Sequence, residues 1–197
     1  MPLFPESAYQ LELPKMHRVL QKFDTTQLEN VEETVRTEMH KKEICSLVKP
    51  GMRIAMAVGS RGIQNLALIV KTVAEELQNM GAKPFIVPAM GSHGGGTEKG
   101  QTAVLESYGI TEEAIGIPVK SSLEVDEIGT VECESGTVQV VVDHYAAHAD
   151  LIIPIGRVKP HTDFRGSIES GLCKMLTIGL GKFEGCTRLH LSLIHIS

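Results

Sequence analysis

The feature that most constrains the fold is a repeated order of short apolar strand, glycine-rich loop and amphipathic helix. Arg53-Ile-Ala-Met-Ala-Val58 is a short apolar run that leads directly into Gly59-Ser-Arg-Gly62. Residues 63–80 then form an amphipathic stretch that stops at Gly81, and a second apolar run covers residues 84–87. This order predicts a βαβ unit with parallel strands and a right-handed crossover.

The rest of the chain continues the pattern, so we expect one Rossmann-like α/β domain. Its sheet should be mostly parallel, with helices on both faces and an added hairpin attached to it. Thr26 and Thr111 each stand where a residue would cap the amino end of a helix. The other predicted elements are helices over residues 26–48, 98–108 and 167–175, a hairpin of residues 125–133 and 137–142, and a strand over residues 150–155.

Composition favours a small-molecule partner. The net charge is −5 and Lys and Arg form no run, which argues against a nucleic-acid or membrane surface. Residues 1–14 carry Glu6 and Glu12 and lack the apolar core of a signal peptide. The cysteines have no paired spacing, so we expect reduced thiols in a cytoplasmic protein. The oligomeric state stays open, with a homo-oligomer among the alternatives.

Three loops follow predicted strands, at the edge where open α/β sheets bind ligands. The first, Gly59-Ser-Arg-Gly62, opens a helix, so free backbone N–H groups and the Arg61 guanidinium suit a carboxylate or phosphate. The simpler alternative is a tight turn from strand to helix. The loop is not a P-loop, because it does not end in Gly-Lys-Ser/Thr.

The second and third loops each bring a histidine to the same edge. His93 lies in Gly91-Ser-His-Gly-Gly-Gly96, which has too many glycines to pack as core and can approach a ligand closely. A histidine there suits acid–base catalysis or metal ligation, and the alternative is a solvated loop histidine. The third loop contains His161, and Lys174 follows it on a predicted helix, where surface exposure is the ordinary alternative.

His144 and His148 are four residues apart, a spacing that zinc-binding histidines use on a helix. No Glu lies between them as in the HExxH arrangement, and Asp143 and Asp150 flank the segment. We therefore expect a solvated short helix between strands rather than a zinc pair.

Two longer segments carry a resemblance to a known family. They are Pro88-Ala-Met-Gly-Ser-His-Gly-Gly-Gly-Thr-Glu-Lys-Gly-Gln101, and Arg157-Val-Lys-Pro-His-Thr-Asp-Phe-Arg-Gly166 with Glu169-Ser-Gly-Leu-Cys-Lys-Met175. They resemble the LarA-like lactate racemase family, in particular its malate-racemase-like or uncharacterised members, from about Arg53 to His190. The resemblance implies a 2-hydroxyacid racemase or epimerase that uses a nickel pincer nucleotide, a pyridinium-derived cofactor that binds nickel through sulfur, carbon and sulfur.

The resemblance also implies roles for single residues. In the family a lysine tethers the cofactor, a histidine completes the nickel coordination, two histidines act as acid and base on opposite faces of the substrate carbon, and an arginine holds the substrate. The family model passes the α-hydrogen as hydride while one histidine takes the hydroxyl proton. By position these residues are Lys174, His190, His93 with His161, and Arg61, and Ser60 is a further cofactor contact.

Two departures from the founding lactate racemase bear on the substrate. That enzyme has an acidic residue shortly before the arginine, whereas this loop reads Val58-Gly-Ser-Arg61, and the stretch from His161 to Lys174 is longer here. A malate-like or sugar-acid substrate therefore stands beside lactate, and covalent attachment of the cofactor stays open. Two other functions remain as alternatives: a non-catalytic nucleotide- or anion-binding α/β module, and a metal hydrolase that uses His93 and His161.

The end of the chain departs from the family pattern. Leu191-Ser-Leu-Ile-His-Ile-Ser197 resembles the translation of a transposon-derived sequencing adapter, so we expect residues 191–197 to be an assembly artefact. Residues 1–190 are then expected to be the amino-terminal catalytic and cofactor domain of a longer enzyme, inactive as a fragment.

Overall fold

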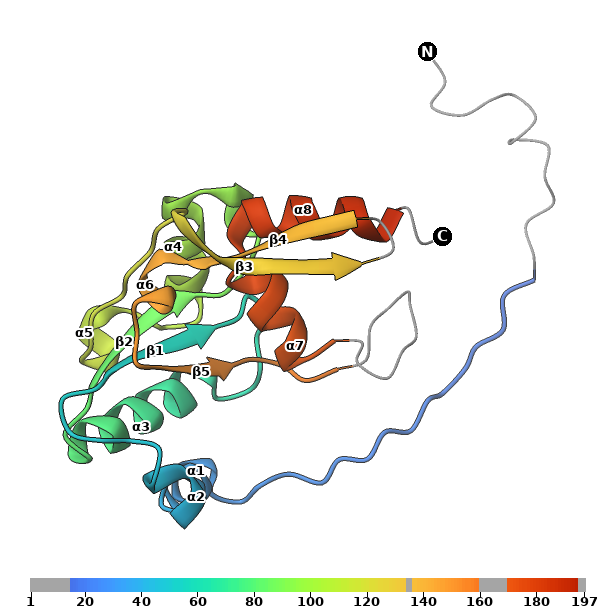
Figure 1. Ribbon diagram of the computed structural model, residues 1–197. Coiled ribbons are helices and arrows are strands. Elements are labelled where there is room, and N and C mark those ends of the chain that lie inside the picture. Colours follow the sequence, from blue (N-terminus) through green and yellow to red (C-terminus); the bar gives the residue numbers. More distant parts are fainter. Residues whose placement is uncertain (1–14, 134–135, 160–169, 195–197) are drawn as a thin grey trace.

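The centre of the fold is a three-stranded parallel sheet (Figure 1). The computed structural model describes residues 15–133, 136–159 and 170–194. The strands are β1 (Arg53–Val58), β2 (Lys83–Pro88) and β5 (Leu151–Ile155), in the order β2-β1-β5. Met56 of β1 pairs with Ile86 on one side and Ile153 on the other. The α/β class and all three predicted strands are confirmed.

Both faces of this sheet are covered, which explains why its strands are continuous apolar runs. Ile54 and Met56 point to one face, where they pack in a core cluster with α3 (Leu66–Asn79). Ala55 and Ala57 point to the other face, into a second cluster that includes Ala146 of α6 (His144–Ala147). The small alanine side chains leave room for α6 to lie close to β1.

The predicted hairpin forms, but it is not a continuation of the parallel sheet. It consists of β3 (Val125–Cys133) and β4 (Gly136–Asp143), which make a separate two-stranded antiparallel sheet. Its attachment runs through α6, which contacts β1, β3 and β4. In addition, the Asp143 N–H donates to the Leu180 carbonyl at 2.7 Å. The predicted hairpin is therefore confirmed, and it is attached through α6 and this hydrogen bond rather than through strand pairing.

The helix predicted over residues 26–48 is shorter and divided. It comprises α1 (Val31–Met39) and α2 (Lys42–Cys45). Asn30 caps α1, since its side-chain oxygen accepts the Glu33 N–H at 3.0 Å. Thr26 instead donates its backbone N–H to Asp24 in an extended segment. The expected Thr26 cap was wrong because Asn30, an equally good capping residue, stands directly before the acidic first turn.

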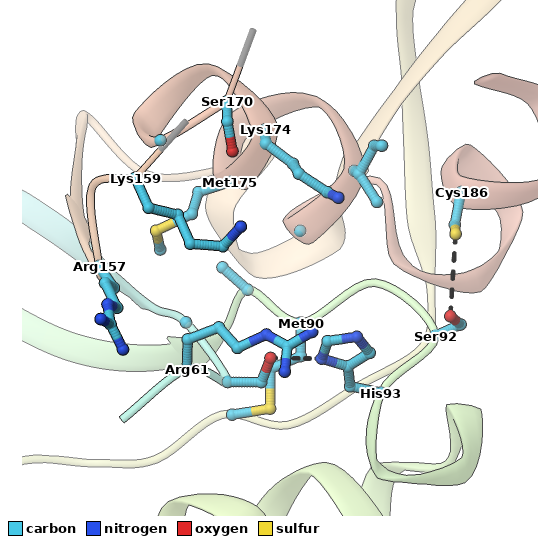
Figure 2. A pocket seen from close by; sticks show the side chains of 16 residues that line it. Arg61, Met90, Ser92, His93, Arg157, Lys159, Ser170, Lys174, Met175 and Cys186 are labelled. Atoms are coloured by element: carbon cyan, nitrogen blue, oxygen red, sulfur yellow. Dashed lines mark hydrogen bonds between the residues drawn. The ribbon is translucent and has the colours of Figure 1, made fainter. Parts of the chain in front are cut away.

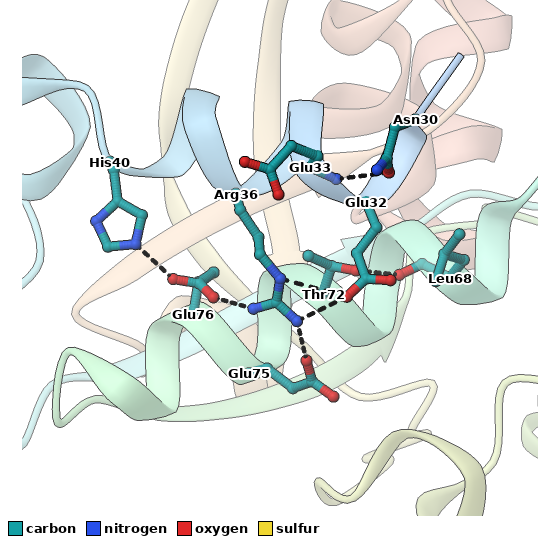
Figure 3. Close-up of polar contacts among 9 residues, drawn as sticks. All are labelled: Asn30, Glu32, Glu33, Arg36, His40, Leu68, Thr72, Glu75 and Glu76. Atoms are coloured by element: carbon teal, nitrogen blue, oxygen red, sulfur yellow. Dashed lines mark hydrogen bonds and ion pairs between the residues drawn. The ribbon is translucent and has the colours of Figure 1, made fainter. Parts of the chain in front are cut away.

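A cluster of charged side chains holds α1 against α3 (Figure 3). Arg36 bonds Glu32 on its own helix, and Glu75 at 2.7 Å and Glu76 on α3. Glu76 is nearly fully buried, and His40 also approaches it, with Nε2 2.7 Å from the carboxylate. Arg36 and His40 thus supply the ion-pair and hydrogen-bond partners that a buried carboxylate requires.

The remaining helices are those that follow β2 and those that follow β5. Thr97 caps α4 (Glu98–Ser107) and, as predicted, Thr111 caps α5 (Glu112–Ile115) by accepting the Ala114 N–H at 3.1 Å. After β5, the described chain resumes with α7 (Leu172–Lys174), the π-helical turn η3 (Met175–Gly179) and α8 (Lys182–Ile194). The predicted helix over residues 167–175 begins outside the described residues. No helix in the described ranges combines the length and apolar character of a membrane span.

Candidate functional site

A cavity of about 360 Å³ opens at the carboxyl ends of β1, β2 and β5. It takes lining residues from all three loops that follow these strands and from α7 and η3, which close it from above in Figure 2. β1 is the central strand. The next strand in the chain, β2, pairs with one side of β1, and β5 pairs with the other side. Ligands of open α/β sheets bind where the strand order reverses in this way. The predicted convergence of the three loops is confirmed.

Glycines let η3 rest directly on the loops of the sheet. The Gly91 N–H donates to the Gly179 carbonyl at 3.0 Å. A Cβ at Gly179 would stand 2.7 Å from the Ala89 carbonyl oxygen, closer than side chains tolerate. Gly91 has φ +59, a conformation that L side chains rarely adopt. The contact between η3 and the loop after β2 therefore depends on backbone-to-backbone packing that an added side chain would push apart.

His93 joins the second loop to the first. Its Nδ1 hydrogen-bonds the Ser60 hydroxyl, and its backbone N–H donates to the Met90 carbonyl at 3.1 Å. The Ser60 loop is in turn fixed by the Tyr108 hydroxyl, which donates to the Ser60 carbonyl at 2.7 Å. Figure 2 shows the imidazole beside the Arg61 guanidinium. These contacts give the ring a defined orientation although it remains exposed at the cavity.

The pKa of His93 lies below its usual value. Partial burial of the ring is the largest cause, and the positive charges of Arg61 and Lys174 add to it. Both effects disfavour the imidazolium. The lowered pKa favours the neutral imidazole, the state in which a histidine can accept a proton from a bound molecule.

The cavity is strongly cationic. Figure 2 shows the side chains of Arg61, Lys159 and Lys174 extending toward the same space, and Arg157 also lines it. Among the described residues that line the cavity, none is Asp or Glu. Converging positive charges attract anions, and a guanidinium binds a carboxylate or phosphate through two parallel hydrogen bonds.

A buried ion pair supports the His93 loop from beneath. Lys182 and Asp143 are both completely buried, with Nζ 2.9 Å from Oδ2. The same ammonium donates to the Pro88 carbonyl at 2.7 Å and lies 3.5 Å from the Gln101 side-chain oxygen. The Gln101 amide donates to the Gly91 carbonyl at 2.8 Å. Burial lowers the pKa of Lys182, and the Asp143 charge opposes this shift.

Sequence reasoning missed this pair. A single lysine between glycine and phenylalanine has no periodicity that distinguishes a buried from an exposed side chain, and its partner is far away in the chain. It also missed the apolar wall formed by Met90, Met175 and Ile178. Cys186 of α8 reaches the cavity as well, with its sulfur 3.8 Å from the Ser92 hydroxyl.

The structure brings together four of the six residues predicted for the site. Ser60, Arg61, His93 and Lys174 all line the cavity. His161 lies outside the described residues. His190 belongs to α8, and its side chain lies outside what the structure describes.

Comparison with known proteins gives one family. Curated proteins and solved structures yielded no match. The family described as the lactate racemase N-terminal domain matches residues 6–197, which is nearly the whole chain. The cavity at the carboxyl edge of the sheet and this match agree with the resemblance seen in the glycine-rich and Lys-Pro-His segments. The chain belongs to the lactate racemase N-terminal domain family.

Proposed function

We propose that this chain is the cofactor- and substrate-binding domain of a racemase or epimerase of 2-hydroxyacids that uses a nickel pincer nucleotide. One observation carries the proposal: His93, an oriented histidine whose pKa is lowered, shares a cavity with the cationic side chains of Arg61, Arg157 and Lys174. A 2-hydroxyacid presents a carboxylate beside a hydroxyl, so it needs a cation for the first and a base for the second. Membership of the lactate racemase N-terminal domain family supports the same reading.

The residues present fit a nucleotide cofactor. Its phosphate would be held by the basic side chains, and the cavity volume of about 360 Å³ lies in the range of small-molecule sites. We assign cofactor contacts to Lys174 and Ser60, and nickel ligation to His190 by its position in the family. When bound, this cofactor supplies a reversible hydride acceptor for the C2 hydrogen.

The chain's own side chains would bind, orient and deprotonate the substrate. Arg61 takes the carboxylate in a two-pronged contact, which points the C2 hydroxyl into the cavity. When Nδ1–H donates to the Ser60 hydroxyl, Nε2 of the neutral His93 is the atom that would accept the hydroxyl proton. His161 serves the opposite face of C2, so that a planar 2-keto acid can be reduced from either side. Inversion at C2 would require the hydrogen to return to the opposite face of the keto acid, and the other histidine would then give the proton to the oxygen.

The cations suggest which hydroxyacids fit. Lactate has one carboxylate, whereas Arg61, Arg157, Lys159 and Lys174 all reach this cavity. A second carboxylate or several hydroxyls could bind to the basic side chains that do not contact the cofactor phosphate. A malate-like or sugar-acid substrate therefore belongs in the proposal beside lactate.

A direct test uses the complete enzyme containing this domain, loaded with cofactor. It should contain nickel by metal analysis and exchange the C2 configuration of at least one member of a panel of mono- and dicarboxylic 2-hydroxyacids. The second candidate, a non-catalytic nucleotide-binding module, is favoured by the same cationic lining. Nucleotide binding without nickel and without exchange at C2 would select that candidate and overturn the racemase.

A further inference from the structure

We propose that Asp126, His144 and His148 form a binding site for a divalent transition metal, with Zn²⁺ as its best-matched ion. The site is separate from the cavity described above and does not rest on the proposed function. The two histidines have the spacing of a zinc pair, but sequence alone offers no acidic partner between them. The fold supplies that partner from another element, the hairpin strand β3.

The three side chains converge on one point. One ligand atom from each lies within 4.8 Å of the others. His144 Nδ1 is 2.9 Å and His148 Nδ1 is 3.3 Å from the same oxygen of Asp126, Oδ2. The two rings are neighbours, with centroids 4.6 Å apart and planes tilted by 47°. Because two imidazole nitrogens already contact one carboxylate oxygen, small side-chain rotations would let a metal ion take the place of these contacts.

The backbone that carries these ligands is well fixed. Asp143 caps α6 through Oδ1, which accepts the Ala146 N–H at 2.9 Å. The His144 N–H donates to the Glu124 carbonyl at 3.0 Å, which ties the start of α6 to the chain just before β3. Asp126 pairs with Val142 in the hairpin register. The ligands are thus positioned by the cap of one helix and the pairing of two strands, as a preorganised metal site requires.

The donor set determines the class of ion. Two imidazoles and one carboxylate are the ligands of zinc sites that keep a fourth position for water. Ca²⁺ and Mg²⁺ prefer all-oxygen shells, so nitrogen donors select against them. His148 Nδ1 also lies 2.9 Å from the His144 carbonyl, so the ion would replace this contact when it binds.

The site is distinct from the cavity, because none of its three residues lines that cavity. α6 directly precedes β5, whereas the cavity takes lining residues from the loop that follows β5. The side chains are accessible: His148 is exposed, and His144 and Asp126 are partly exposed. An ion can therefore enter from solvent without displacing core residues.

Zn²⁺ titration of the chelator-treated full chain by calorimetry tests this assignment. We expect the Zn²⁺ equivalent bound by this site to be lost, or its Kd to rise about tenfold or more, in both His148→Ala and Asp126→Asn. Imidazole ¹⁵N spectra should show the His144 and His148 resonances shifting with the same equivalent. Circular dichroism establishes that both variants remain folded, which their exposed positions favour.

Two matched variants locate the ion. His17→Ala removes an exposed histidine from the extended amino-terminal segment, and His93→Ala removes the cavity histidine. Both should retain the equivalent and its affinity. The assignment is overturned if the wild-type chain binds no Zn²⁺, if His148→Ala and Asp126→Asn bind it like the wild type, or if His93→Ala alone abolishes binding.

Discussion

The ammonium of Lys182 lies 2.9 Å from the Asp143 carboxylate, and neither side chain has any exposure to solvent. This contact joins the first turn of α8 to the end of the hairpin. Through the Pro88 carbonyl and Gln101 it also reaches the loop that carries His93. The site thus rests on a buried charge pair rather than on apolar packing alone.

Breaking this pair should cost more than breaking an exposed one. Asp143→Asn keeps the oxygen that caps α6 but leaves the Lys182 ammonium buried without its counter-charge, and we expect the free energy of unfolding to fall by about 3–5 kcal/mol. Glu38→Ala is the matched control, because it removes a pair with Lys41 whose side chains are more than half exposed. It should change stability by less than about 1 kcal/mol. Urea denaturation measures both, and equal losses would contradict the structural role assigned to the buried pair.

The titration of His93 should report its surroundings. Because the folded-state pKa is lowered, the unfolded chain binds the proton more tightly. The resulting contribution of His93 to stability is therefore fully retained above pH 6.5, the unfolded value, and lost as the pH falls through the folded pKa. Proton NMR should give His93 a midpoint below 6.5, and Arg61→Gln should raise it by removing a positive neighbour. A midpoint that does not move in Arg61→Gln would show that the guanidinium does not act on this ring.

Replacement of His93 should affect turnover more than that of its partner Ser60. In the complete, cofactor-loaded enzyme, His93→Gln removes the proposed base, and kcat should fall about 10²–10⁴-fold. Ser60→Ala removes only the hydroxyl that orients Nδ1, so its loss should be smaller and the pH profile of kcat/KM should shift. Racemisation followed by chiral chromatography gives both values. Full activity of His93→Gln on the true substrate would remove His93 from the mechanism.

Two glycine substitutions should distinguish an effect on ligand binding in the cavity from an effect on stability alone. Gly179→Ala puts a Cβ 2.7 Å from the Ala89 carbonyl, so we expect a loss of about 1–3 kcal/mol together with weaker binding of anionic ligands in the cavity. Gly116→Ala is the comparison: its φ of +83 imposes strain, but nothing lies within 4 Å of the added carbon. It should reduce stability without changing anion binding, as measured by calorimetry with inorganic phosphate. Unchanged phosphate binding in Gly179→Ala would show that the cavity tolerates a shift of η3 away from Ala89.

The sequence was most informative where local pattern and fold topology coincide. Short apolar runs followed by glycine-rich loops predicted β1 and β2. Parallel pairing of these strands then brings Arg61 and His93 to the same edge of the sheet. Capping at Thr111 was predictable because the signal is local. At Thr26 the same signal failed, since Asn30 offered a competing cap nearer the acidic turn.

Contacts between distant segments could not be predicted. The Asp143–Lys182 pair depends on how β4 meets the start of α8, which no residue spacing encodes. Asp126 became a neighbour of His144 only through the hairpin register and the turn of α6. The sequence interpretation judged the two histidines without it, and so expected only a solvated helix.

The two oxygens of Asp143 serve two different parts of the fold. Oδ1 caps the helix that carries His144, and Oδ2 faces the lysine beneath the His93 loop. Asparagine would preserve the cap and lose the charge, whereas a longer glutamate would need space that a fully buried position does not have. In evolutionary terms, two separate requirements restrict which residues position 143 can accept. Deep mutational scanning should therefore find fewer tolerated substitutions at position 143 than at His144 or His148.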